Sequence, residues 1–114
     1  MIDVATKKLT KTIEPKGENV RPMGIVLSPD GRRAFVTTGR GKTVVMMNTA
    51  ADAVTDTIPE VGVRPWGIAI TSDGKTLYTA NGPSNDVSVI DATTLKVIQK
   101  IPAGQSPWGV AIMP

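Results

Sequence analysis

The sequence contains no histidine and no cysteine. Histidine is the commonest general base and metal ligand in proteins, and cysteine supplies thiol nucleophiles, thiolate metal ligands and disulfides. A Ser-His-Asp or Cys-His catalytic site therefore cannot form within this chain. We expect a protein that is not an enzyme and that has no catalytic residues and no metal site.

Long apolar runs and aromatic side chains are scarce as well. No apolar run approaches the roughly 20 residues that a membrane helix needs, and residues 1–13 lack the apolar centre of a secretory signal. We expect no membrane partner and no signal peptide in this chain. We also expect no nucleic-acid partner, because the 13 basic residues are dispersed, the net charge is only +3, and few aromatic residues could stack on bases.

Turn-forming and β-branched residues are abundant instead. The 114 residues include 11 glycines and 9 prolines, and threonine, isoleucine and valine make up roughly a third of the chain. This composition is typical of many short strands separated by turns. Since the length allows one domain, we expect a single all-β unit.

A repeat organises the chain. A Pro-x-Gly motif occurs three times, 43 and then 42 residues apart, as Pro22-Met23-Gly24, Pro65-Trp66-Gly67 and Pro107-Trp108-Gly109. Residues 22–48 align with residues 65–91 without a gap, and 7 of the 27 positions are identical. Chance rarely keeps turns and apolar stretches in register over such a length.

Each repeat divides into four short strands. In the second repeat we expect them at Gly67–Thr71, Thr76–Ala80, Asp86–Asp91 and Lys96–Ile101. An Asp-Gly pair between the first two strands is a strong hairpin signal, and the third strand alternates with a period of two. A four-stranded unit that recurs about every 40–45 residues has the period of a β-propeller blade.

Residues 76–112, TLYTANGPSNDVSVIDATTLKVIQKIPAGQSPWGVAI, resemble the YVTN-type propeller repeat. More narrowly, the chain is similar to the last blades of bacterial propellers associated with PQQ-dependent catabolism. It departs from the YVTN pattern after Tyr78, where Thr79-Ala80-Asn81 replaces the remaining three residues of the pattern, and the first repeat departs further. The resemblance implies a propeller fold and, for a full-length parent, a periplasmic or secreted location.

The phase of the repeat predicts two full blades with partial blades at both ends. The expected boundaries are 2–14 for the end of a preceding blade, 22–58 and 65–101 for full blades, and 109–113 for the first strand of a further blade. Propellers usually close with four to eight blades, and an open blade face leaves apolar side chains in water. We therefore expect the ends to be covered by other copies of the chain or by missing blades of a longer parent, and the resemblance favours truncation of such a parent.

Two repeated features, the middle residues of the Pro-x-Gly motifs and the Asp-Gly pairs, are interpreted as structural. The residues concerned are Met23, Trp66, Trp108, Asp30, Gly31, Asp73 and Gly74. The first three occupy the middle of the Pro-x-Gly motif; an aromatic ligand cage is the alternative, but methionine in one copy fits packing between blades better. The Asp-Gly pairs are expected to shape hairpin turns whose carboxylates cap their own backbone, rather than to act in catalysis or calcium binding.

A second set of residues is interpreted as a binding site. In propellers, the loops that enter the innermost strand and those that join strands two and three share one face. On that assumption six polar residues would ring the mouth of the channel, namely Arg21, Arg64, Arg40, Lys42, Asn81 and Asn85. Such a ring would suit an acidic protein or a small anionic ligand; the alternative is that these residues only solvate the rim.

We expect no cofactor. Propeller quinoprotein dehydrogenases carry a tryptophan docking motif, and residues 71–81 have its Asp-Gly turn without the tryptophan that should follow. The expected function is a non-catalytic binding or scaffold module, as a fragment of a larger periplasmic propeller. The alternative is a set of non-catalytic blades from a periplasmic oxidoreductase or hydrolase whose active site lies on missing blades.

Overall fold

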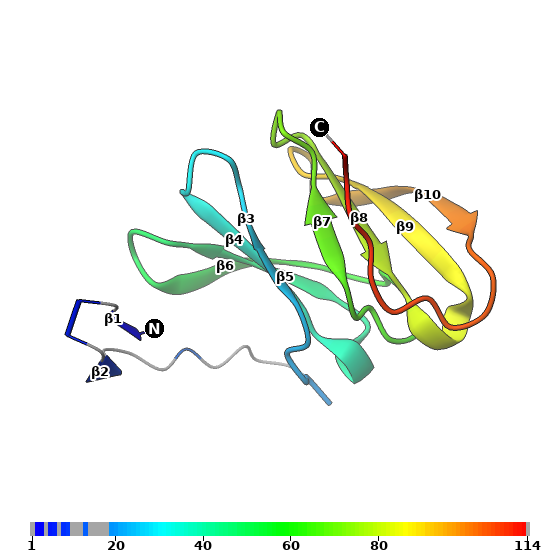
Figure 1. Ribbon diagram of the computed structural model, residues 1–114, viewed down its shortest axis with the longest axis horizontal. Coiled ribbons are helices and arrows are strands. Elements are labelled where there is room, and N and C mark those ends of the chain that lie inside the picture. Colours follow the sequence, from blue (N-terminus) through cyan, green and yellow to red (C-terminus); the bar gives the residue numbers. More distant parts are fainter. Residues whose placement is uncertain (1, 4, 7, 10–12, 14–18, 114) are drawn as a thin grey trace.

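The computed structural model describes the chain except for residues 1, 4, 7, 10–12, 14–18 and 114 (Figure 1). The described part is all-β, as predicted, with two four-stranded antiparallel sheets. Two single turns of 3-10 helix are the only helical segments among the described residues. No helix in this part of the chain is long and apolar enough to cross a membrane.

Each four-stranded sheet is a meander in which consecutive strands are neighbours. The first blade consists of β3 (Ile25–Leu27), β4 (Arg33–Thr37), β5 (Val44–Asn48) and β6 (Ala53–Ile58). The second blade consists of β7 (Ile68–Ile70), β8 (Thr76–Ala80), β9 (Asp86–Asp91) and β10 (Lys96–Pro102). The helical turns η1 (Gly39–Gly41) and η2 (Gly82–Ser84) join the second and third strands of the two blades.

A short hairpin of β1 (Ile2–Asp3) and β2 (Lys8–Leu9) precedes the two blades. Asp3 pairs with Lys8 in this hairpin, and Asp91 pairs with Lys96 in the same register 88 residues later. The pairing of residues 2–3 with residues 8–9 therefore repeats the register between the third and fourth strands of a blade. The remainder of the predicted segment 2–14, apart from residue 13, lies outside the described residues.

The two blades share one core because each presents an apolar face to the other. Phe35, Val44 and Ile58 of the first blade and Leu77 and Ile90 of the second are fully buried and belong to one cluster. Since side chains alternate between the two faces of a strand, the neighbours of these residues along each strand point to the opposite face. Burial of this cluster is the main force that holds one blade against the other.

The opposite face of the first blade is exposed at its innermost strand, β3. Ile25 is 66% exposed and Leu27 is 55% exposed, whereas the residues that align with them in the second repeat, Ile68 and Ile70, pack against the shared core. The same repeat position is therefore covered in one blade and uncovered in the other.

The C-terminal segment follows the repeat without joining a sheet. The Gly82 N–H donates to the Pro107 carbonyl at 3.0 Å, as the Gly39 N–H donates to the Pro65 carbonyl at 3.2 Å. The third Pro-x-Gly motif thus sits on the second blade as the second motif sits on the first, and its chain runs beside β7 (Figure 1). Residues 109–113 have no strand partner among the described residues, so a first strand there stays a prediction.

Candidate functional site

The loops that carry the predicted binding residues lie at one end of the molecule. The Val61 N–H donates to the Lys42 carbonyl, and the Val63 N–H donates to the Ser84 hydroxyl. These bonds join the connection between the blades to the segments around η1 and η2, both of which lie at the lower end of Figure 1. The Asp-Gly hairpins lie at the upper end. We call the lower end the mouth face.

Four cations of the predicted ring lie on the mouth face. We call Arg21, Arg40, Lys42 and Arg64 the mouth cations. The first three are exposed and Arg64 is half-buried, and none has an ion-pair partner among the residues that the structure describes. Glu60 and Asp86 are the acidic residues within 19–22, 38–43, 59–64 and 81–86, and Asp86 accepts a hydrogen bond from Asn81. With four cations against two carboxylates, these segments are positive overall.

Lys42 and Asn85 also have a structural role. They occupy equivalent repeat positions at the ends of η1 and η2, with φ of 64° and 59°. Their N–H groups donate to the carbonyls of Gly39 and Gly82. The Asn85 side-chain oxygen accepts a hydrogen bond from the Ser106 N–H at 3.0 Å, which leaves its amide nitrogen as the group turned to other partners.

Asn81 lies in the interior rather than on the rim. It is fully buried, and its amide donates to Asp86 and Ser88 at 2.8 Å each while its oxygen accepts from Thr79 at 2.8 Å. Ser88 in turn donates to the Val61 carbonyl at 2.5 Å, so this network ties the second blade to the loop that enters it. With these partners Asn81 is unavailable to a ligand at the mouth.

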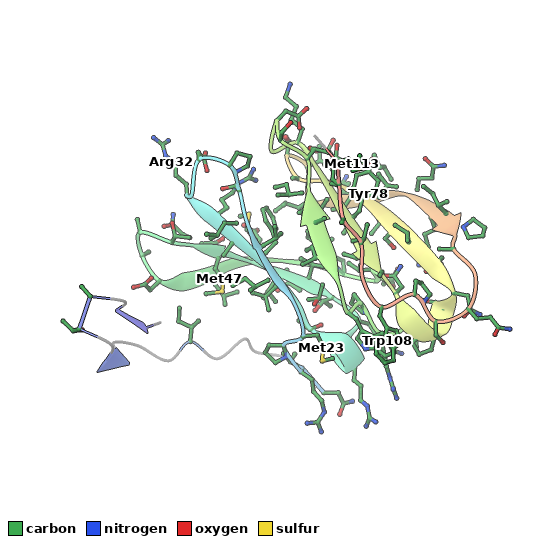
Figure 2. All side chains as sticks on the ribbon, in the orientation of Figure 1. Met23, Arg32, Met47, Tyr78, Trp108 and Met113 are labelled. Atoms are coloured by element: carbon green, nitrogen blue, oxygen red, sulfur yellow. The ribbon has the colours of Figure 1, made fainter. Side chains whose placement is uncertain are left out.

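An apolar groove adjoins the mouth cations. It has a volume of about 550 Å³, and it is lined by Met23, Gly24, Arg64, Trp66, Gly67 and Trp108. All three middle residues of the Pro-x-Gly motif thus meet at one groove, with a single charged side chain in the wall. Figure 2 shows Met23 and Trp108 at the mouth face. We call this the aromatic groove.

The two tryptophans differ in how they are supported. The ring of Trp66 packs on Gly82 of its own blade, and the ring of Trp108 meets it edge to face with centroids 5.6 Å apart. Trp108 itself is 74% exposed. The edge-to-face pair leaves most of the Trp108 surface uncovered by the described residues.

The Asp-Gly turns show the local capping that the sequence predicts for them. The Asp30 carboxylate accepts hydrogen bonds from the Ser28 hydroxyl and the Arg32 N–H. These bonds hold its pKa below the ordinary value. Gly74 follows the equivalent aspartate with φ of 73°, a conformation that suits glycine. Both turns lie at the end of the molecule opposite the mouth face.

Arg33 joins the two blades, a role that the sequence reasoning missed. Its guanidinium donates to the Ala92 carbonyl at 2.7 Å and to the Gly74 carbonyl at 3.4 Å, both in the second blade. It also lies over the Phe35 ring, 5.2 Å from the centroid. The sequence shows only that the repeat differs at this position, because threonine in the second blade aligns with Arg33 in the first.

Comparison with known proteins identifies the fold. No family model matches the chain, and no curated protein matches it. Hydrazine synthase of Kuenenia stuttgartiensis, a solved structure, is 30% identical with a TM-score of 0.77; the match covers 90% of this chain and 29% of that one. The WD40 repeats of RRP9 and the structure of U3-55K each match with 16% identity and a TM-score of 0.68, covering 81% of this chain and 29% of theirs.

These likenesses and the two meandering sheets define the class: the chain folds as blades of a β-propeller. The prediction of propeller blades is therefore confirmed. The chain spans less than a third of the length of each of these three solved structures.

Proposed function

We propose that this chain is a non-catalytic binding or scaffold module built from YVTN-type blades, and that the mouth face is its binding surface. The observation that carries the proposal is that three hydrogen-bonded loops bring four cations to one end of the molecule, where Arg64 also lines the aromatic groove. Arginine and lysine at such a surface favour carboxylate or phosphate groups. The partner proposed is an acidic protein or a small anionic ligand.

The non-catalytic part of the proposal rests on the chemistry that the chain can supply. It has no histidine or cysteine, and the aspartates of the two Asp-Gly turns are engaged with their own backbone. The YVTN assignment rests on the repeat in residues 76–112. The same resemblance is our ground for proposing a periplasmic or secreted parent, which fractionation of cells that express the full-length protein would test.

A second candidate function is supported by the likeness to hydrazine synthase. At 30% identity over 90% of this chain, the blades could belong to an oxidoreductase whose reactive groups lie elsewhere. In that case the mouth face would contact another part of the same enzyme. Purification of the full-length protein, with a search for bound redox cofactors by absorption spectroscopy, would distinguish this candidate from a free-standing binding module.

The first experiment measures binding of fluorescent peptides by anisotropy. A capped glutamate octapeptide should bind, and its affinity should fall as salt is raised because the mouth cations are exposed. A lysine octapeptide should not bind. Single-stranded DNA of the same length is included because it is also an anion; binding to DNA that equals binding to the acidic peptide would contradict a protein partner.

Charge reversal locates the site. The double substitution Arg40→Glu with Lys42→Glu should weaken binding of the glutamate peptide by at least about tenfold, since attraction becomes repulsion. Arg32→Glu is the control, because Arg32 is an exposed cation at the opposite end of the molecule (Figure 2). Equal weakening by the two changes, or no binding by the unmodified protein, would overturn the proposal.

A further inference from the structure

The aromatic groove has chemistry that the mouth cations alone do not explain. Its walls are the apolar side chains of Met23, Trp66 and Trp108, and Arg64 is its one charged group. Purely electrostatic attraction of an anion would need no such apolar surface. Exposed tryptophan beside arginine is instead the composition typical of energetically important positions in protein interfaces.

The charge of the groove excludes one obvious class of ligand. Aromatic side chains gathered around a pocket can bind a quaternary ammonium or methylated lysine through cation–π attraction. Here Arg64 is one of the lining residues, and its positive charge would disfavour a cation held beside the rings. A ligand that combines an apolar group with a carboxylate satisfies both halves of the site.

The surroundings of the groove favour a chain over a small molecule confined to it. Gly24 and Gly67 contribute no side chains to it, so backbone forms part of its lining. Beyond it, the Met23 side chain packs on Gly39, which precedes Arg40 in η1. The Arg21 N–H donates to the Thr38 carbonyl, so two further loops that carry mouth cations adjoin the groove. A ligand that fills the groove and meets these charges must extend past it.

We infer that the aromatic groove holds one large apolar side chain of an acidic peptide segment, whose flanking carboxylates meet Arg64 and the other mouth cations. This inference rests on the proposed function and names the kind of partner that the mouth face recognises. The apolar side chain supplies selectivity by covering Trp108, and the carboxylates supply attraction and orientation.

The test compares two capped octapeptides of glutamate that differ at one central position, leucine in one and alanine in the other. The chain has two tryptophans, both in the groove, so their fluorescence reports occupancy directly. We expect the leucine peptide to bind about tenfold more tightly than the alanine peptide, since burial of a leucine side chain contributes at least about the free energy of one tenfold step. It should also shift tryptophan emission to shorter wavelength.

Substitutions separate the two contributions. Trp108→Ala should reduce the preference for leucine to less than about threefold while leaving the alanine peptide nearly unaffected, because hot-spot side chains carry most of the apolar contact. Trp108 is 74% exposed, so the variant should fold, which circular dichroism verifies. Arg64→Gln should weaken both peptides together. Met113→Ala is the control, since Met113 is 92% exposed at the far end of the molecule (Figure 2).

Each outcome has a defined meaning. Equal affinity for both peptides, or a leucine preference that survives Trp108→Ala, would overturn the groove inference while the proposed acidic partner stands. Failure of every acidic peptide to bind would overturn the proposed function itself. Tight binding of 4-methylpentanoate alone, a free apolar carboxylate, would replace the peptide by a small-molecule ligand. Binding of a leucine peptide flanked by lysines would contradict the role given to Arg64.

Discussion

The aspartate of each Asp-Gly turn is held by the same pair of contacts, one with a side-chain hydroxyl and one with a backbone N–H. Asp73 accepts hydrogen bonds from the Thr71 hydroxyl at 2.5 Å and from the Lys75 N–H at 2.9 Å. Both bonds favour the ionised carboxylate, so they hold the pKa of Asp73 below its ordinary value of 3.8. A charged group at an exposed turn thereby contributes to the geometry of the hairpin.

A dependence of stability on pH follows from this direction. The folded pKa lies below the unfolded one, so the contribution is present above the unfolded pKa and is lost as pH falls through the folded pKa. We expect the urea midpoint to decrease below about pH 4, where unfolded aspartate begins to protonate. Asp73→Asn should lower the midpoint at pH 7 and make the decrease on acidification smaller.

The control for this change is Asp56→Asn, which removes the same charge from an exposed position in β6. If Asp56→Asn altered the acid limb as much as Asp73→Asn, general charge rather than turn geometry would explain the pH dependence.

The hydrogen-bond partners of Asn81 and Arg33 could not be predicted from the sequence. Asn81 aligns with Thr38 of the first repeat, and its type alone does not reveal whether an amide faces solvent or a buried network. The structure supplies Ser88, Asp86 and Thr79 as its partners. Arg33 reaches carbonyls in the other blade, and such a long-range contact leaves no trace in local spacing.

At the scale of elements, strand positions were largely predictable and the groove was not. Apolar alternation and turn residues locate β8 and β9 at their observed ends, because these depend on neighbours along the chain. The groove depends on how successive Pro-x-Gly motifs stack across blades. Equivalent positions for Met23, Trp66 and Trp108 were visible in the sequence, whereas the exposed surface of Trp108 requires the fold.

Successive Pro-x-Gly motifs approach each other so closely that glycine is required at position 67. A Cβ built at Gly67 would lie 2.6 Å from the Cα of Gly109 and 2.7 Å from the Trp108 carbonyl oxygen. Gly67→Ala should therefore reduce the free energy of unfolding by about 1–3 kcal/mol through overpacking, measured by equilibrium denaturation in urea.

Gly109→Ala provides a matched control from the same motif, because a Cβ at Gly109 would meet nothing within 4 Å. Its effect on the denaturation midpoint should be small. Equal destabilisation by the two alanines would show that intrinsic backbone preference, and not the contact between blades, makes glycine necessary.

On the scale of the whole molecule, the two faces of the first blade differ in what covers them. One face of the first blade packs Phe35 and Val44 against the second blade. The other face exposes Ile25 and Leu27, which align with core residues of the second blade. In the second blade the equivalent face packs against the first blade. We therefore propose that the exposed face of the first blade binds another blade, either of a second copy or of a parent chain.

For the isolated chain this predicts self-association that depends on concentration. In sedimentation equilibrium the apparent mass should rise above the 12.0 kDa of one chain as concentration increases, because removing the exposed apolar side chains of β3 from water is favourable. Leu27→Glu should restore a monomer by placing a charge in that face.

Ile98→Glu is the control, since Ile98 is 62% exposed on β10 of the other blade. A folded monomer at every concentration for the unmodified chain would show that the open face tolerates water, and an equal effect of both glutamates would place the contact elsewhere than on the first blade.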